Sequence, residues 1–295
     1  MPALLDHPLL FVTGKGGVGK STVALALALR AREAGRRVVV GEVGGQGRIA
    51  RMYGREPLAD GRELEVDDGL FTMTVDVEAA LREWFGTLLP RRLATLLVSS
   101  GTFAAFANAA PGAKELAAAV KLWELGQPKR WRGGETFDTV IVDAPASGHG
   151  LGLLRTPATF ASLARVGPLG KQAAAVRDAF ADPRHTAVVA VTAPSELSVS
   201  ETLELEARTP LGAIVANGVL AKRFTRDQAD AVAAGVDGAI GALVARNDAS
   251  VREQQAQLRR LRKGATADVH ALPWVAQGDL GVDDVDTLSR ALARL

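Results

Sequence analysis

A glycine-rich loop near the N-terminus constrains the fold of this chain more than any other feature. Residues 14–22 read GKGGVGKST; the apolar run 9–13 precedes them and an Ala/Leu-rich stretch follows. A strand, a glycine loop and a helix in this order, with the pattern G-x-x-x-x-G-K-[ST], are typical of a loop that binds nucleotide phosphates. The glycines let backbone N–H groups approach phosphate oxygens, and the helix beginning near Lys20 directs the positive end of its dipole at them.

The pattern also assigns roles to individual residues. Lys20 is expected to neutralise the β- and γ-phosphates, the Ser21 hydroxyl to ligate Mg²⁺, and Thr22 to bind the α-phosphate. A second segment completes the site, because the apolar run 137–142 ends at Asp143, a carboxylate placed to hold Mg²⁺ through water. ATP and Mg²⁺ are therefore the predicted cofactors. The loop backbone that would enclose the phosphates comprises Gly14, Lys15, Gly16, Gly17, Val18 and Gly19.

Short apolar runs alternate with longer amphipathic stretches along the whole chain. Because the runs are continuously apolar, they predict strands covered on both faces, which is typical of a parallel sheet between helices. We predict an α/β P-loop NTPase fold: a doubly wound, mostly parallel sheet of about seven strands, with helices on both faces. The expected strands are residues 9–13, 37–42, 70–75, 137–142, 186–192, 212–217 and 268–272, and the expected helices include 21–34, 196–208, 227–246 and 284–295.

One stretch interrupts this alternation. Residues 77–132 contain no convincing strand and carry several aromatic side chains, among them Trp84, Trp123 and Trp131. We interpret the chain as a single P-loop ATPase domain, 1–295, into which 77–132 is inserted as a helical subdomain. Two interpretations of the insertion stay open: ordinary helical packing, or a lid or partner surface, because long insertions in compact domains often carry function.

Charge and composition exclude several classes of function. The chain has 35 Lys+Arg against 33 Asp+Glu, a net charge of +2, which gives no argument for a nucleic-acid partner. It has no cysteine, so disulfides, thiolate metal sites and cysteine nucleophiles are excluded. No apolar run reaches the ~18–20 residues of a membrane span, and no secretory leader is evident. We expect a cytoplasmic protein that is not integral to a membrane.

Two lysines in the loop, Lys15 and Lys20, point to a particular group of ATPases. The sequence GKGGVGKST resembles the deviant Walker A loop of the MinD, ParA, nitrogenase iron protein and ArsA group. The resemblance implies that Lys15 reaches across a dimer interface to the phosphates bound by the partner subunit, where a cation relieves repulsion and stabilises phosphoryl transfer. The expected working unit is thus a dimer, either of like chains or of unlike, related chains.

The segment DAPASGHGLGLLRTP, residues 143–157, resembles switch II of the ArsA family, which includes the arsenite-pump ATPase and the ATPase that targets tail-anchored proteins. VANGVL and LPWVAQGDLGVDDV resemble later family segments, which implies that Asn217 reads the adenine and that Pro273 is also a nucleotide-binding residue. The Ala/Arg/Gly-rich chain also resembles an actinobacterial subfamily of paired ArsA-like proteins. Switch II matches the family at Asp143, Gly148, His149, Leu151, Leu153, Leu154 and Pro157, whereas Pro145 stands one position early.

The chain departs from the family at switch I. The family's Asp-Pro, whose Asp positions the attacking water, is absent from VVVGEVGGQGRIARMYG, and Glu42 and Gln46 are the candidate replacements. Three functions stay open: a nucleotide-gated dimeric ATPase with weak activity, a hydrolysis-impaired subunit that pairs with an active relative, and a client-binding chaperone or targeting factor for membrane helices. In the third, a protein client would bind at the helical insertion.

Overall fold

The computed structural model describes residues 4–45, 47–58, 61–88, 112–131, 133–163, 167–235, 238–275 and 280–292. Eight strands form one sheet in the order β3-β4-β2-β5-β1-β6-β7-β8. Neighbouring strands are parallel except for the pair β3–β4. The strands are β1 (Leu9–Gly14), β2 (Val38–Val43), β3 (Leu64–Asp67), β4 (Leu70–Val75), β5 (Thr139–Asp143), β6 (Thr186–Thr192), β7 (Ala213–Val219) and β8 (Val269–Pro273).

The predicted doubly wound α/β fold is confirmed, and each of the seven expected strands is present. The eighth strand, β3, escapes the prediction because it is a short edge strand in which Glu65 and Asp67 are exposed and only Val66 is buried. A charged, irregular edge of this kind discourages pairing with another chain.

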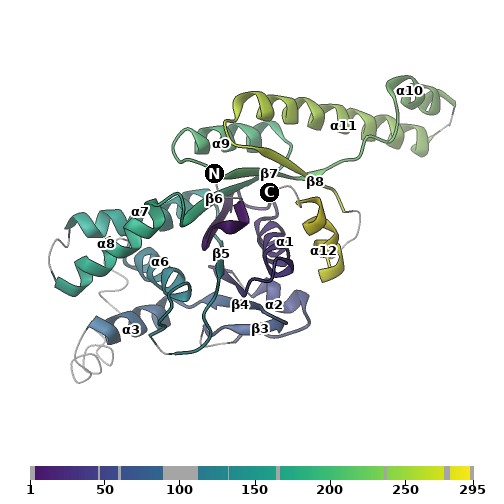
Figure 1. Ribbon diagram of the computed structural model, residues 1–295. Coiled ribbons are helices and arrows are strands. Elements are labelled where there is room, and N and C mark those ends of the chain that lie inside the picture. Colours follow the sequence, from purple (N-terminus) through teal and green to yellow (C-terminus); the bar gives the residue numbers. More distant parts are fainter. Residues whose placement is uncertain are drawn as a thin grey trace.

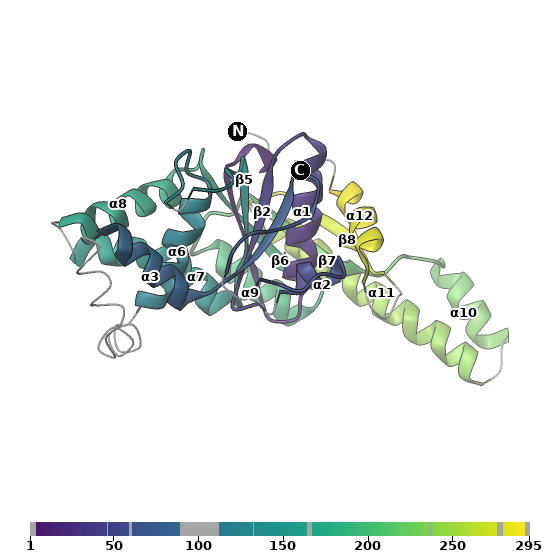
Figure 2. The same ribbon diagram turned by 90° about the horizontal axis from the view of Figure 1, so that it is seen from below.

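Helices cover both faces of the sheet (Figures 1 and 2). The described helices are the 3₁₀ turn η1 (Leu4–Asp6), α1 (Lys20–Glu33), α2 (Arg48–Met52), α3 (Val77–Leu88), α6 (Ala113–Leu125), α7 (Ser147–Leu163), α8 (Gly167–Ala181), α9 (Glu196–Glu206), α10 (Arg226–Gly235), α11 (Ala239–Gly264) and α12 (Val282–Ala291). On one face, strand residues such as Leu10 and Val12 are buried against α1, α2 and α12. On the other face, the alternate residues Leu9 and Phe11 are buried against α3, α6, α7 and α8, and α9 and α11 cover the β6–β7 part. Among the described helices, none is both long and apolar enough to cross a membrane.

The segment predicted as a helical insertion, 77–132, contributes α3 and α6 to the described structure, while 89–111 and Arg132 lie outside it. Helix α6 packs directly on the sheet, because a Cβ added at Gly41 of β2 would lie 2.5 Å from Cδ2 of Leu122. Whether 77–132 behaves as a subdomain stays a prediction.

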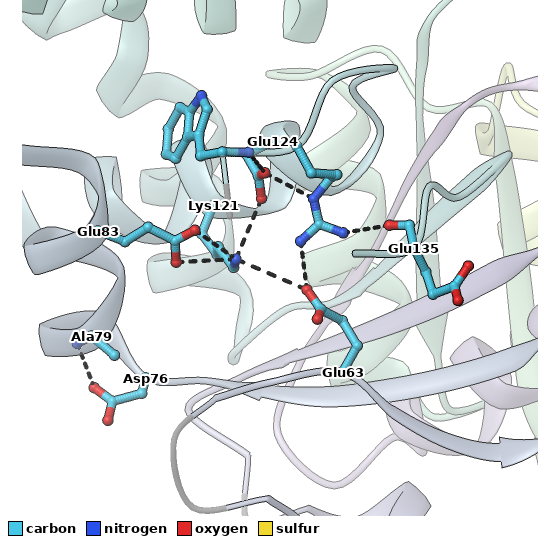
Figure 3. A network of polar contacts seen from close by, with 9 residues as sticks. Glu63, Asp76, Ala79, Glu83, Lys121, Glu124 and Glu135 are labelled. Carbon is cyan, nitrogen blue, oxygen red and sulfur yellow. Dashed lines mark hydrogen bonds and ion pairs between the residues drawn. The ribbon is translucent and has the colours of Figure 1, made fainter. Parts of the chain in front are cut away.

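A buried ion-pair network joins α3 and α6 (Figure 3). Lys121 Nζ donates to Glu83 Oε2 at 3.2 Å and to Glu124 Oε2 at 3.3 Å, and Arg130 Nε donates to Glu124 Oε1 at 2.8 Å. Arg130 also donates to Glu63 Oε1 at 2.6 Å, just before β3. Burial alone would raise the pKa of Glu63, yet this hydrogen bond holds the pKa below its ordinary value. Each carboxylate therefore depends on a cation contributed by α6 or by the segment after it.

Removing one cation from this network should destabilise the fold. We expect Lys121→Met to lower the free energy of unfolding by about 3–5 kcal/mol, because it removes the buried cation that Glu83 and Glu124 share. Urea unfolding measures the change. Arg82→Met is the matched control, since Arg82 pairs with Glu78 on the exposed surface of α3 and its loss should cost about 0.5 kcal/mol or less. Equal effects of the two substitutions would contradict a structural role for the network.

Candidate nucleotide-binding site

The glycine loop lies between β1 and α1 at the carboxyl end of the sheet. Gly14 ends β1 so close to β6 that an added Cβ would lie 2.2 Å from the carbonyl oxygen of Val191, so no side chain fits there. Gly19 has φ of 89° at the N-cap of α1, and no side chain caps this helix end. The first N–H groups of α1 are thus left to an anion, as expected for a phosphate site.

Ser21 and Asp143, the two predicted Mg²⁺ ligands, are brought together. Ser21 Oγ donates a hydrogen bond to Asp143 Oδ2 at 2.6 Å, linking the start of α1 to the end of β5. Hydroxyl and carboxylate oxygens are the ligand types that Mg²⁺ prefers, with phosphates and water completing its shell. No cluster of three or more His, Cys, Asp or Glu suited to a metal occurs among the described residues. Bound there, Mg²⁺ would supply positive charge against the β- and γ-phosphates.

Lys20 and Asp143 act on each other's pKa, the carboxyl being buried and the ammonium half-buried. Burial raises the pKa of the Asp143 carboxyl, and the Ser21 hydrogen bond and the charge of Lys20 oppose this only in part. Burial lowers the pKa of the Lys20 ammonium, whose Nζ donates to the carbonyl oxygen of Lys15 at 3.1 Å. Burial therefore disfavours the charged form of both groups, and an anionic phosphate at Lys20 and a cation at Asp143 would each offset that cost.

Lys15, the extra lysine of the loop, is paired within its own chain. Its Nζ lies 2.8 Å from Oε1 of Glu201 on α9, and both side chains are about two-fifths exposed, at 39% each. A half-exposed pair of this kind is weak. The predicted reach of Lys15 across a dimer interface is not tested by a single chain.

Asn217 of β7 and Pro273 of β8 lie on neighbouring strands, on the opposite side of the glycine loop from Asp143. Asn217 Nδ2 donates to the carbonyl oxygen of Val18 at 2.9 Å, so the end of β7 is tied to the glycine loop. Pro273 ends the neighbouring strand β8, opposite Val219. The ring of Trp274 follows, 62% exposed and lying against Gly218. An amide and an exposed aromatic ring are suited to a nucleobase.

Glu42 is buried, with 1% of its surface exposed, and its carboxylate is engaged. Oε2 accepts from the backbone N–H of Arg48 at 2.9 Å and Oε1 from that of Ile49 at 3.3 Å, so Glu42 anchors the start of α2. Burial raises the pKa of Glu42, and these two hydrogen bonds oppose the shift. A role for Glu42 in orienting water stays a prediction, and Gln46 lies outside the described residues.

Arg48 belongs to this site although sequence analysis does not single it out. It is the first residue of α2, its side chain is exposed, and its charge acts on both Lys20 and Asp143. The available signal is modest: Arg48 is the first basic residue after the glycine-rich stretch that follows β2.

The raised pKa of Asp143 predicts that its charge destabilises the nucleotide-free protein. The native state holds the carboxyl proton more tightly than the unfolded state, so stability falls as pH rises through the window between the ordinary and the raised pKa. We expect Asp143→Asn to raise the melting temperature at pH 7 by a few degrees, with the gain shrinking as pH falls through that window. Scanning calorimetry tests this, with the exposed Asp68→Asn as control. A lower melting temperature would show that Ser21 and Lys20 outweigh the cost of burial.

Comparisons with known proteins agree with this geometry. A family model described as anion-transporting ATPase, of the ArsA type, matches residues 7–167. The ATPase BagA of Mycobacterium tuberculosis is 30% identical over 217 residues, which cover 70% of this chain and 63% of that relative. The ATPase GET3 of Candida glabrata is 26% identical over 235 residues, which cover 68% of this chain and 67% of that relative. The match thus spans less than two thirds of the mycobacterial protein. Since the family model covers more than half of the chain, including the glycine loop and Asp143, the chain belongs to the ArsA family of anion-transporting ATPases.

Proposed function

We propose that this chain binds ATP with Mg²⁺ and hydrolyses it slowly, as one subunit of a nucleotide-gated dimer. The observation that carries the proposal is the 2.6 Å contact between Ser21 Oγ and Asp143 Oδ2, which joins the glycine loop to the end of β5. In the reaction, a water oxygen bonds to the γ-phosphorus, and the bond between that phosphorus and the β,γ-bridging oxygen breaks. ADP and inorganic phosphate leave, and the water's surplus proton passes to solvent or phosphate. Membership of a family of ATPases supports this assignment.

The residues of this chain would act by binding and orientation. Lys20 and the backbone N–H groups of the loop would bind the phosphates, and Ser21 and Asp143 would hold the metal. Asn217 and the exposed ring of Trp274 lie where a base could be held, on the opposite side of the loop from Asp143. The substrate would then span the sheet edge from β5 to β8.

The dimer is the part of the proposal that depends on Lys15. Its ion pair with Glu201 is half-exposed and weak, so Lys15 can exchange this carboxylate for the phosphates of a partner subunit. The pair would then be broken when the dimer closes on ATP. Both a dimer of like chains and a dimer with a related ATPase agree with this role.

A hydrolysis-impaired subunit is the second candidate function, and the state of Glu42 favours it. Both carboxylate oxygens of Glu42 accept hydrogen bonds from α2, and the side chain is buried, so Glu42 is held in place as the anchor of α2 rather than presented to an attacking water. A subunit of this kind would bind ATP and turn it over only beside an active relative. The client-binding alternative stays a prediction, because much of its proposed surface, 89–111, lies outside the described residues.

Phosphate release tests the proposed activity. With Mg²⁺ and ATP, the pure chain should release phosphate, and Lys20→Ala should lower the rate at least ~10²-fold because the transition-state charge loses its cation. Lys129→Ala, the loss of an exposed lysine outside the site, should leave the rate unchanged. Equal rates in all three proteins would refute the assignment. Tight ATP binding without turnover would favour the hydrolysis-impaired subunit.

Sedimentation analysis with a non-hydrolysable ATP analogue tests the dimer. Glu201→Gln should shift the monomer–dimer midpoint to lower protein concentration, by at most ~5-fold, because the competing ion pair is partly exposed. Lys15→Ala should shift it to higher concentration. A wild-type chain that stays monomeric with the analogue bound would refute a dimer of like chains.

A further inference from the structure

Glu42 does more than fill the core: it determines where α2 begins. Gly45 lies so close to its carboxylate that a Cβ added there would be 2.9 Å from Glu42 Oε2. Gly47, at φ of 69°, turns the chain into α2, and an added Cβ there would lie 2.5 Å from the ring of Pro57. Glu42 is thus a positioning residue for the first turn of α2.

The anchor also places α2 beside the metal-binding end of the site. Glu42 is the register partner of Asp143 in the parallel pair β2–β5, so the two carboxylates stand at adjacent positions of the sheet. Asp143 is in turn bound to Ser21. The backbone N–H of Arg48, bound to Glu42, is therefore two strands away from the glycine loop, on the side where Mg²⁺ and the terminal phosphate would lie.

Arg48 brings a positive charge to that side. Its side chain is exposed, and within the described part of the chain no ion pair involves its guanidinium. Its charge nevertheless lowers the pKa of Lys20 in addition to the larger effect of burial, and it opposes the effect of burial on Asp143. Among the described residues, the guanidinium thus has no carboxylate partner, and the first turn of α2 holds it on the side of the site where Glu42 and Asp143 are register partners.

The two sides of the site differ in chemistry, and the difference orients a bound nucleotide. On the β5–β2 side lie Asp143, Glu42 and Arg48; on the β7–β8 side lie Asn217 and Trp274. A nucleoside triphosphate that places its base against an amide and an aromatic ring must direct its γ-phosphate toward the charged side. A guanidinium there matches a phosphate's geometry and forms strong, charge-assisted hydrogen bonds.

We propose that Arg48 binds the γ-phosphate within its own subunit and is the residue by which the site distinguishes a nucleoside triphosphate from a diphosphate. This rests on the proposed ATP binding and extends it to Arg48, which lies in the switch I segment but is not one of the residues to which the sequence motifs assign a role. Because Arg48 is the first residue of α2, the γ-phosphate would hold α2 in place, and its loss would free the helix from the phosphate site.

Calorimetric titration with a non-hydrolysable ATP analogue and with ADP, both with Mg²⁺, tests the proposal. Arg48→Ala should weaken binding of the analogue about 10- to 100-fold and change binding of ADP less than about twofold, since only the analogue carries the third phosphate. Arg48→Lys should recover part of the loss, because it keeps the charge without the planar donor geometry. Arg51→Ala is the matched control, an exposed arginine one turn further along the same helix, and should change neither affinity.

Other results would each overturn a stated part of the proposal. Unchanged affinity for the analogue in Arg48→Ala overturns the proposal. An equal loss for ADP and the analogue also overturns it, because it indicates that the residue supports the fold of the site rather than the γ-phosphate; thermal unfolding of the variant checks that fold. A wild-type chain that binds neither nucleotide overturns the proposed function itself, whereas one that binds both equally overturns only the role of Arg48.

Discussion

The parallel pairing of β1, β5 and β2 is the constraint on which the rest of the site depends. Its registers place Asp143 beside Val12 of one neighbouring strand and beside Glu42 of the other. Because parallel strands end at the same edge, the glycine loop after β1 and the switch loops after β2 and β5 all begin around one point. A slip of one residue would turn Asp143 or Glu42 to the opposite face of the sheet. Ser21 would then lose its carboxylate partner, and α2 its anchor.

Two buried carboxylates at paired positions cost free energy, and the chain offsets this cost in two different ways. Glu42 is satisfied by the chain itself, through backbone N–H groups of α2 and a 3.4 Å hydrogen bond from Thr72. Asp143 is instead stabilised by Ser21 and Lys20, groups that a nucleotide and its metal would also bind. A carboxylate whose hydrogen bonds all come from the protein itself serves to position a helix. One that shares its partners with a ligand belongs to the binding site. This difference separates the roles of the two acids more sharply than their position in the sequence does.

Sequence analysis predicts those parts of the molecule in which local pattern and tertiary structure agree. The seven parallel strands follow from continuous apolar runs, and the glycine loop from a spacing that few other structures require. Where local pattern is weak, prediction fails: the predicted helix 227–246 is divided in the structure into α10 and α11, with Gly238 at φ of 80° before α11. Long-range pairing is beyond reach, since nothing local indicates that Lys15 meets Glu201, 186 residues further along the chain. A place for Arg48 in the site is likewise not predictable from local pattern, because it depends on the hydrogen bond between the Arg48 backbone and Glu42, which is known only from the fold.

The contact between α6 and β2 connects the phosphate site to the insertion. Leu122 of α6 occupies the space beside Gly41, one residue before Glu42, and any side chain at Gly41 would displace it. On the same helix, Lys121 is bound to Glu83 of α3. Close-packed interiors do not deform gradually, so a shift of β2 large enough to move Glu42 must also move α6 and, through the buried ion pair, α3. A γ-phosphate bound by Arg48, as proposed above, would therefore also restrain the two helices that flank 89–111. The packing would in that case couple the predicted partner surface to the part of the site that changes when ATP becomes ADP.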